Sequence, residues 1–440
     1  MSYRIFRLCI AGPYFERFFE FADSLGNLSF DAAMQRCRES GFLYPGRFKA
    51  EMERHGVDVM EALVDVPALQ KKWLDENGGG VFSKEDAVLR QMKAFKPDIV
   101  FFQTFLALSP EVRRRIKEEC PSVRIVCGHR GFPIDDCTGY EDVDAAFLGY
   151  PRFHDRWHAV GVRTFFHLHC FDEGLLPEIR RRASEMEAIP FSFIGTTGWG
   201  FGPHDGRYYD LRRVLDATDL TVFGNEPPSA QQPLVKLPGA ARMHIRKSLI
   251  ETAKYLPDAV LKLMAETGAR INFPIMERGA EAALRRKRFG PEVAVPQVTS
   301  ENFWYHKEKP IRELYPERIH PSRVGLEYFA TLAASDVTWN RHLEMEGAGA
   351  NMRLFEACGA GTCQLVDYRD EVVQAFEPDV EIAVYRSIDE CIEKARWLRD
   401  HPAERKAIAA AGQARALKDH SVAQRAAGLH EHFLELLRSA

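Results

Sequence analysis

Short runs of β-branched and aromatic residues alternate along this chain with longer stretches whose apolar residues recur at helical spacing. This alternation is typical of strand–helix–strand units that build a parallel sheet. The runs form two series, separated by the charged stretch 172–190. We therefore predict an α/β fold with two consecutive parallel-sheet domains. The predicted strands are 5–10, 57–62, 99–103, 124–127, 145–148 and 164–167 in the first series, and 191–194, 220–223, 337–340, 362–367 and 382–385 in the second.

One stretch of the second series departs from this pattern. Residues 227–322 contain 11 of the chain's 24 prolines and keep no strand alternation, so we interpret them as an insertion. Its basic cluster, 285–288, is either a solvated helix face or a contact for an anionic membrane surface or acceptor. The tail, 402–437, is predicted to form two closing helices.

Composition excludes some classes of function. The chain has 59 Lys and Arg against 63 Asp and Glu, so no global positive field favours nucleic-acid binding. We expect no signal peptide and no transmembrane helix, because no apolar run approaches the length that spans a bilayer. The nine cysteines show no C-x-x-C spacing, which favours buried or free thiols and a cytoplasmic location, with peripheral membrane contact left open.

Ligands of parallel sheets bind at the carboxyl ends of the strands, and a glycine-rich loop follows the predicted strand 191–194. Its Gly195, Thr196 and Gly198, with Arg207 beyond the loop, form a candidate cradle for a diphosphate. The spacing does not match G-x-G-x-x-G, and a plain surface loop is the alternative.

Asn340, Arg341 and His342 emerge where the predicted strand 337–340 ends, and we expect them to face a cleft. Arg341 could bind a phosphate through two parallel N–H groups. The alternative is an ordinary surface arginine beside a histidine that hydrogen-bonds a loop carbonyl.

A third polar segment begins at Asn351, which suits a helix N-cap, and Gly359 suits the stop of a short helix. Such a helix N-terminus favours an anion, and Glu356 offers a carboxylate for the two hydroxyls of a ribose. A local surface ion pair between Arg353 and Glu356 is the alternative. The donor-binding candidates of this segment are Asn351, Met352, Arg353 and Glu356.

The region 325–376, and more loosely 191 to the end, resembles the C-terminal domain of group-one glycosyltransferases, in particular the branch related to the spore-maturation protein CgeB. The segment 95–103, FKPDIVFFQ, is similar to a motif in the N-terminal half of that branch. The matching C-terminal segments are GLEYF (325–329), NRH (340–342), NMRLFEA (351–357), AFEP (375–378), VYRS (384–387) and AAGQARALKDH (410–420).

The resemblance implies a GT-B fold, with two Rossmann-like domains facing across a cleft. Residues 1–180 would bind the acceptor, 181–418 the nucleotide sugar, and 419–440 would form a helix packing back towards the N-terminal domain. The implied activity is sugar transfer from a nucleoside-diphosphate sugar to a glycan, protein or small molecule, with retention of configuration and with neither metal nor cofactor.

Residue by residue, the resemblance assigns the ribose contact to Glu356. Glu356 matches the second glutamate of the family's E-x7-E pair, and the first falls at Ala348, for which Glu344 or Glu346 could substitute. His129 matches a histidine near the reacting carbon, and Asp135 is the other candidate base if configuration is inverted.

Three other functions remain open at this point. A sugar-nucleotide epimerase or hydrolase and a non-catalytic binding module share the fold, while the loop spacing disfavours a nicotinamide-dependent oxidoreductase. Two patterns resemble metal sites, and we interpret both as structural. Asp142 and Asp144 precede a predicted strand and are interpreted as the turn that enters it. His154 and His158 have the spacing of a zinc-binding helix but lack its glutamate. His167 and His169 are expected to line the core or the cleft.

Overall fold

The computed structural model describes residues 2–11, 25–80, 83–131, 137, 139–150, 153–199, 205–224, 255–270, 280, 309–342 and 349–439. The chain divides into two units, each described by itself below. The first comprises Met1–Ile194, Arg213–Phe223 and Ser322–Ala440, and the second comprises Gly195–Arg212 and Gly224–Pro321.

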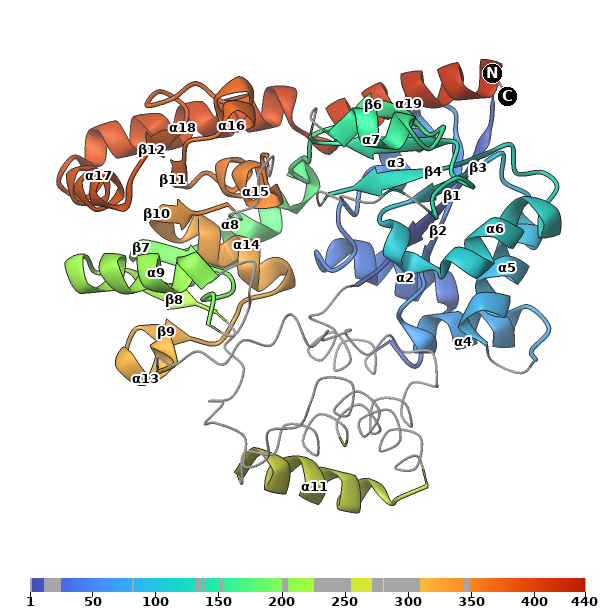
Figure 1. The fold of residues 1–440 in the computed structure, drawn as a ribbon, viewed down its shortest axis with the longest axis horizontal. Coiled ribbons are helices and arrows are strands. Elements are labelled where there is room, and N and C mark those ends of the chain that lie inside the picture. The colour runs from blue at the N-terminus through green and yellow to red at the C-terminus, as the bar shows by residue number, and fades with distance from the viewer. Residues whose placement is uncertain are drawn as a thin grey trace. The chain divides into compact units, whose positions relative to one another are not determined.

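The first unit contains two parallel sheets (Figure 1). The strand order of the first sheet is β2-β1-β3-β4-β5-β6, and every pairing is parallel. Most of these strands are apolar and buried on both faces, as expected of a sheet covered by helices on each side. The strands are β1 (Arg4–Cys9), β2 (Asp58–Leu63), β3 (Ile99–Phe102), β4 (Ile125–Arg130), β5 (Ala145–Leu148) and β6 (Arg163–Phe166).

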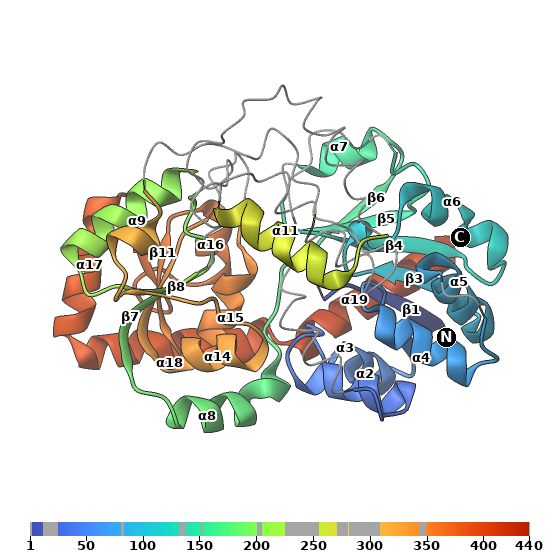
Figure 2. The same cartoon turned by 90° about the horizontal axis from the view of Figure 1, so that it is seen from below.

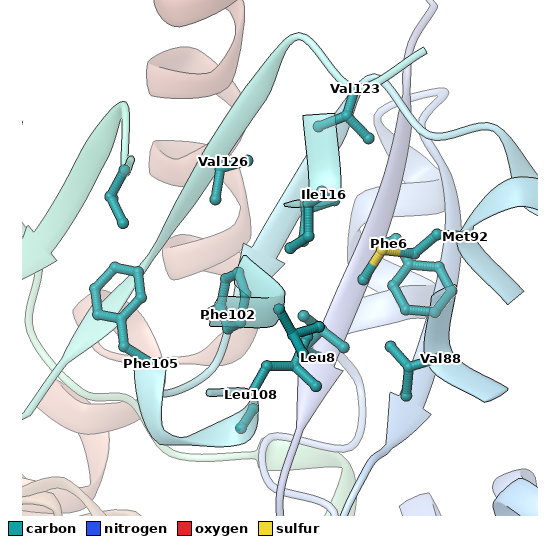
Figure 3. Packing of buried hydrophobic residues seen from close by; sticks show 14 of the residues in the cluster. Phe6, Leu8, Val88, Met92, Phe102, Phe105, Leu108, Ile116, Val123 and Val126 are labelled. Atoms are coloured by element: carbon teal, nitrogen blue, oxygen red, sulfur yellow. The ribbon is translucent and has the colours of Figure 1, made fainter. Parts of the chain in front are cut away.

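Helices pack on both faces of this sheet. On one face, Phe6 of β1 packs beside Val88 and Met92 of α5 (Lys84–Phe95), and Phe102 of β3 packs beside Phe105 (Figure 3). The further helices of this half of the chain are α2 (Phe30–Glu39), α3 (Phe48–Arg54), α4 (Pro67–Glu76), α6 (Pro110–Glu119) and α7 (His154–His158).

The opposite face is covered in part by the last helix of the chain, α19 (Val422–Ser439). Phe433 of α19 makes edge-to-face contacts with Phe101 and Phe147 of the sheet, at ring distances of 5.5 and 5.7 Å. The prediction that the C-terminal helix returns to the N-terminal domain is therefore confirmed.

The second sheet has six strands, of which five belong to the first unit, run in the order β12-β11-β10-β7-β8 and pair in parallel. All eleven predicted strands are present, and the two-residue strand β9 was not predicted. The strands are β7 (Ile189–Ile194), β8 (Thr221–Phe223), β9 (Ile319–His320), β10 (Ser335–Asn340), β11 (Cys363–Asp367) and β12 (Ala383–Tyr385). The α/β prediction with two parallel-sheet domains is confirmed.

Three helices of the second sheet lie together in Figure 2: α14 (Gly325–Ala333), α15 (Met352–Ala360) and α18 (Pro402–Asp419). The core beneath α15 includes Leu354 and Phe355, which pack with Val366 of β11 and Phe376. The remaining helices are α8 (Leu176–Ser184), α9 (Asp205–Ala217), α16 (Asp370–Ala375) and α17 (Ile388–Asp400).

The predicted helix stop at Gly359 is wrong. Helix α15 continues to Ala360 and ends at Gly361, whose φ of 91° is the left-handed conformation that glycine adopts without strain. Gly359 has a different role, because a Cβ there would lie 2.1 Å from Cγ of the buried Phe171. Glycine is required at 359 by close packing.

Gly359→Ala is expected to destabilise the protein by at least about 1 kcal/mol, because the added methyl group forces the buried Phe171 ring to move. The matched control is Gly428→Ala in α19, where a Cβ meets no atom within 4 Å. That substitution should be neutral or stabilising, since alanine favours a helix more than glycine does. If the denaturant midpoints of the two variants shift by the same amount in the same direction, this account is wrong.

The second unit contains α11 (Asp258–Arg270) and α13 (Ile311–Leu314). Leu261 of α11 is buried with Ala280, and the hydroxyl of Tyr208 donates to the carbonyl of Lys309 at 2.7 Å. The basic cluster at 285–288 lies outside the described residues. Across the described ranges, no helix has the length and apolar content needed to cross a membrane.

The nine cysteines are all buried free thiols, as their spacing predicted. Burial raises the pKa of the Cys9 thiol to about 12.

Candidate active site

Helix α15 begins at an N-cap, as the sequence predicts. The Asn351 backbone is extended, and its side-chain oxygen accepts a hydrogen bond from the Leu354 N–H at 3.1 Å. This bond satisfies one of the amides that a helix start leaves without an intrahelical partner.

A pair of amides joins this helix start to the end of β10. Asn340 Nδ2 donates to Asn351 Oδ1 at 3.0 Å, and Asn351 Nδ2 donates back to Asn340 Oδ1 at 2.8 Å. Asn340 Nδ2 also donates to Gln364 Oε1 at 3.1 Å, and Gln364 Nε2 donates to the Arg353 carbonyl of α15 at 3.1 Å. These side chains fix the N-terminus of α15 against two neighbouring strands.

His342 joins the same helix start to the end of β11. Its backbone N–H and its Nδ1 lie 2.9 and 2.7 Å from Asp367 Oδ1, and its Nε2 accepts from the Asn351 N–H at 3.2 Å. Because Nε2 accepts a hydrogen bond from Asn351, Nδ1 is the ring nitrogen that donates to Asp367.

Asp367 is the anionic end of this chain of hydrogen bonds. Burial alone would raise the pKa of its carboxyl group, but the attraction and hydrogen bonds of His342, together with Arg369, lower that pKa to about 2. Asp367 is therefore ionised at neutral pH and holds His342 in place.

The expectation that Asn340 and His342 face a cleft is wrong. Their exposed fractions are 0% and 2%, because their polar atoms are used to position α15. Arg341 between them is partly exposed, and its Nη1 lies 3.4 Å from the His342 carbonyl. Asn340 and His342 thus hold the start of α15 in place.

Glu356 lies in the middle of α15 with 7% of its surface exposed, so a surface ion pair with Arg353 does not describe it. The Tyr328 hydroxyl of α14 donates to Glu356 Oε2 at 2.6 Å. Burial raises the pKa of Glu356, although Tyr328 and the charge of Arg353 lower it. Among the described residues, no hydrogen-bond donor reaches the second carboxylate oxygen, Oε1.

Arg353 and Met352 complete the first turn of α15. The Arg353 guanidinium lies over the Phe193 ring of β7, 5.5 Å from its centroid, whereas Met352 is 40% exposed. The turn therefore presents one charged and one apolar side chain beside Glu356.

The glycine-rich loop belongs to the second unit. Gly195 and Gly198 have φ of 153° and 87°, and Arg207 Nη1 donates to the carbonyl and to the Oγ1 of Thr196, at 3.2 and 3.0 Å. Positive φ at both glycines explains why the loop is glycine-rich. The candidate donor residues of this loop therefore belong to the second unit, whereas those of β10 and α15 belong to the first unit.

His129 lies near the carboxyl end of β4, and burial lowers its pKa to about 4. Asp135 falls outside the described residues, as do Glu344, Glu346 and Ala348.

The two patterns interpreted as structural have protein partners. Asp142 accepts two hydrogen bonds from Arg113, and Asp144 Oδ2 accepts one from the Val126 N–H at 2.6 Å. His154 and His158 both lie within hydrogen-bond distance of Thr164 Oγ1, at 2.9 and 2.7 Å.

Sequence reasoning missed Tyr328, Gln364 and Asp367. Two of them could have been found from the sequence. Tyr328 belongs to the GLEYF segment that resembles the glycosyltransferases, and Asp367 is a polar residue at the carboxyl end of a predicted strand. Gln364 could not have been found in this way, because it is a polar residue inside a buried strand.

The family model described as Glycosyl transferase-like matches residues 278–431, which include α14, β10, α15 and β11. No curated protein matches the chain. The chain has the GT-B fold, and its residues 278–431 are similar to the glycosyltransferase-like family.

One similar solved structure is named a glycosyltransferase, and a second is named a sucrose-phosphate synthase. Sucrose-phosphate synthase from Thermosynechococcus elongatus is 11% identical, with a TM-score of 0.52, and a glycosyltransferase from Rickettsia africae is 8% identical, with a TM-score of 0.51. Each comparison covers 100% of both chains. HepE from Anabaena, solved with UDP-glucose, is 11% identical with a TM-score of 0.48, over 98% of this chain and 100% of that chain.

Proposed function

We propose that this protein transfers a glycosyl group from a nucleoside-diphosphate sugar to a glycan, protein or small-molecule acceptor. The observation that carries the proposal is Glu356, a buried carboxylate with one oxygen bound by Tyr328 and the other left for a ligand. Two hydroxyls of a ribose can donate to such a carboxylate. The glycosyltransferase-like match over the same segment supports this interpretation.

The start of α15 supplies the second half of donor recognition. In the described part of the chain, the Met352 and Arg353 amides show no protein acceptor, and the helix dipole favours an anion at this end. The hydrogen bonds of Asn340, His342 and Asn351 keep these amides in place before a ligand arrives. Preorganised amides of this kind stabilise the negative charge that develops on a departing diphosphate.

The remaining parts of the proposal concern chemistry at the sugar. Retention of configuration would let the leaving diphosphate take the acceptor's proton, without a metal. If configuration is inverted, a base is needed, and His129 and Asp135 are the candidates. With its pKa lowered to about 4 by burial, the His129 imidazole is neutral at physiological pH, as a base must be, but it is a weak base.

The experiment that tests the proposal is a panel of nucleoside diphosphates scored by thermal stabilisation. A ligand that binds only the native state raises the melting temperature, so one diphosphate should do so in a concentration-dependent way. The corresponding nucleotide sugar should then be consumed only when an acceptor is present. No stabilisation by any member of the panel would refute the proposal, and consumption without an acceptor would favour a hydrolase.

A further inference from the structure

Three histidine rings meet at the carboxyl edge of the first sheet. His129 lies near the end of β4, and His167 and His169 follow β6. The His129 ring centroid lies 5.6 Å from that of His167 and 4.9 Å from that of His169, and both ring pairs are edge-to-face. A Cβ on Gly131 would lie 3.4 Å from His129 Cε1 and 3.5 Å from His169 Cε1, so glycine leaves the ring edges uncovered.

None of the three imidazoles forms a side-chain hydrogen bond or ion pair with the described residues. All three residues are nevertheless only partly exposed. Polar groups in such a position usually have partners, so three unpartnered imidazoles together are unusual. Across the described residues, no three His, Cys, Asp or Glu side chains are placed to hold one metal ion.

The surroundings of the cluster are cationic. Arg425 of α19 donates to the Leu168 and His169 carbonyls at 2.9 and 3.1 Å, and its charge acts on His167 and His169. His432 of α19 also acts on His167. In the described chain, no carboxylate is among the groups that shift the pKa of His129 or His169.

Phe147 of β5 packs edge-to-face on His167, with the ring centroids 5.8 Å apart, and Tyr150, which follows β5, donates its hydroxyl to the Gly131 carbonyl at 2.6 Å. Burial raises the pKa of Tyr150 to about 12, so it stays neutral. Burial, together with Arg425 and the neighbouring rings, keeps the imidazoles neutral in the free protein. An anion among the rings would change this, because its charge stabilises imidazolium and raises the pKa of the rings it contacts.

From this arrangement we propose that His129, His167 and His169 bind the phosphoryl group of a phosphorylated acceptor. Three separate ring donors match the three terminal oxygens of a phosphoryl group, whereas a carboxylate has two. The inference rests on the proposed function, because it assigns this edge to the acceptor while α15 binds the donor. No bond to the phosphoryl group forms or breaks, since the group serves only to hold the acceptor.

Sulfate is a suitable probe, because it mimics a phosphoryl group and stays dianionic from pH 6 to 8. Calorimetry should show sulfate binding that tightens as pH falls, by up to about tenfold per pH unit for each proton taken up. The double variant His167→Gln, His169→Gln should lose this binding, and the control His158→Gln should keep it. His158 is a suitable control because its ring already contacts Thr164.

Thermal stabilisation by the nucleoside diphosphate should be unchanged in the double variant, which separates this inference from the proposed function. If the double variant does not fold, the imidazole NMR signals of the wild type decide, because the rings that stay neutral at pH 6 should shift with sulfate. Equal sulfate binding in the double variant and the wild type, acetate binding tighter than sulfate, or tight Zn²⁺ binding that blocks sulfate would each overturn the inference.

Discussion

Glu356→Gln is expected to weaken nucleoside-diphosphate binding by about 1.5–3 kcal/mol, roughly 10- to 150-fold, because ribose hydroxyls lose a charged acceptor. The same substitution should leave the melting temperature unchanged or raise it. Burial raises the pKa of Glu356, so the folded state disfavours its ionisation, and stability is lost as pH rises from the ordinary carboxyl pKa through the raised one. A neutral glutamine removes this cost at neutral pH.

The matched control is Glu327→Gln, which removes the same charge from the exposed side of α14. It should change neither affinity nor stability measurably, since surface ion pairs contribute little. Calorimetry in which both variants bind the nucleotide like the wild type would exclude Glu356 from the site. A large drop in the melting temperature of Glu356→Gln would show that the carboxylate is structural.

Asp367→Ala is expected to destabilise the protein by about 3–5 kcal/mol, the range for removing one partner of a buried pair. The substitution leaves the His342 backbone N–H and Nδ1–H without their acceptor. Asp367→Asn keeps one acceptor oxygen and should lose less. Denaturant unfolding should therefore rank the wild type above the asparagine variant and the alanine variant last, while Asp400→Ala on the surface of α17 stays near the wild type.

Acid should remove the same contribution from the wild type. The folded-state pKa of Asp367 is about 2 and its ordinary value is 3.8, so its stabilisation is fully present above pH 4 and is lost as pH falls towards 2. The stability difference between wild type and Asp367→Ala should shrink over this range. A difference that is constant from pH 6 to pH 2 would contradict the ionised state of Asp367.

The strands and the N-cap were predictable because they depend on local sequence. Apolar runs located all eleven predicted strands, and Asn351 ahead of an apolar stretch marked the start of α15. The same alternation predicted the two parallel-sheet domains, and the resemblance to glycosyltransferases implied the return of the last helix to the N-terminal domain.

The errors arose where a role depends on residues distant in the chain. Asn340 and His342 looked like ligand-facing residues, but Asn351, Gln364 and Asp367 use their polar atoms. Gly359 and Gly361 are both plausible helix stops, and only the Phe171 ring distinguishes them. The partner of Glu356, Tyr328, lies on another helix, which a pattern within one helix does not show.

The central claim is that the start of α15 and Glu356 bind the diphosphate and ribose of the donor. A crystal structure with the nucleoside diphosphate that stabilises the protein tests it most directly. We expect a ribose hydroxyl within hydrogen-bond distance of Glu356 Oε1 and phosphate oxygens at the Met352 and Arg353 amides. A nucleotide bound elsewhere, with Glu356 contacting only Tyr328, would contradict the claim.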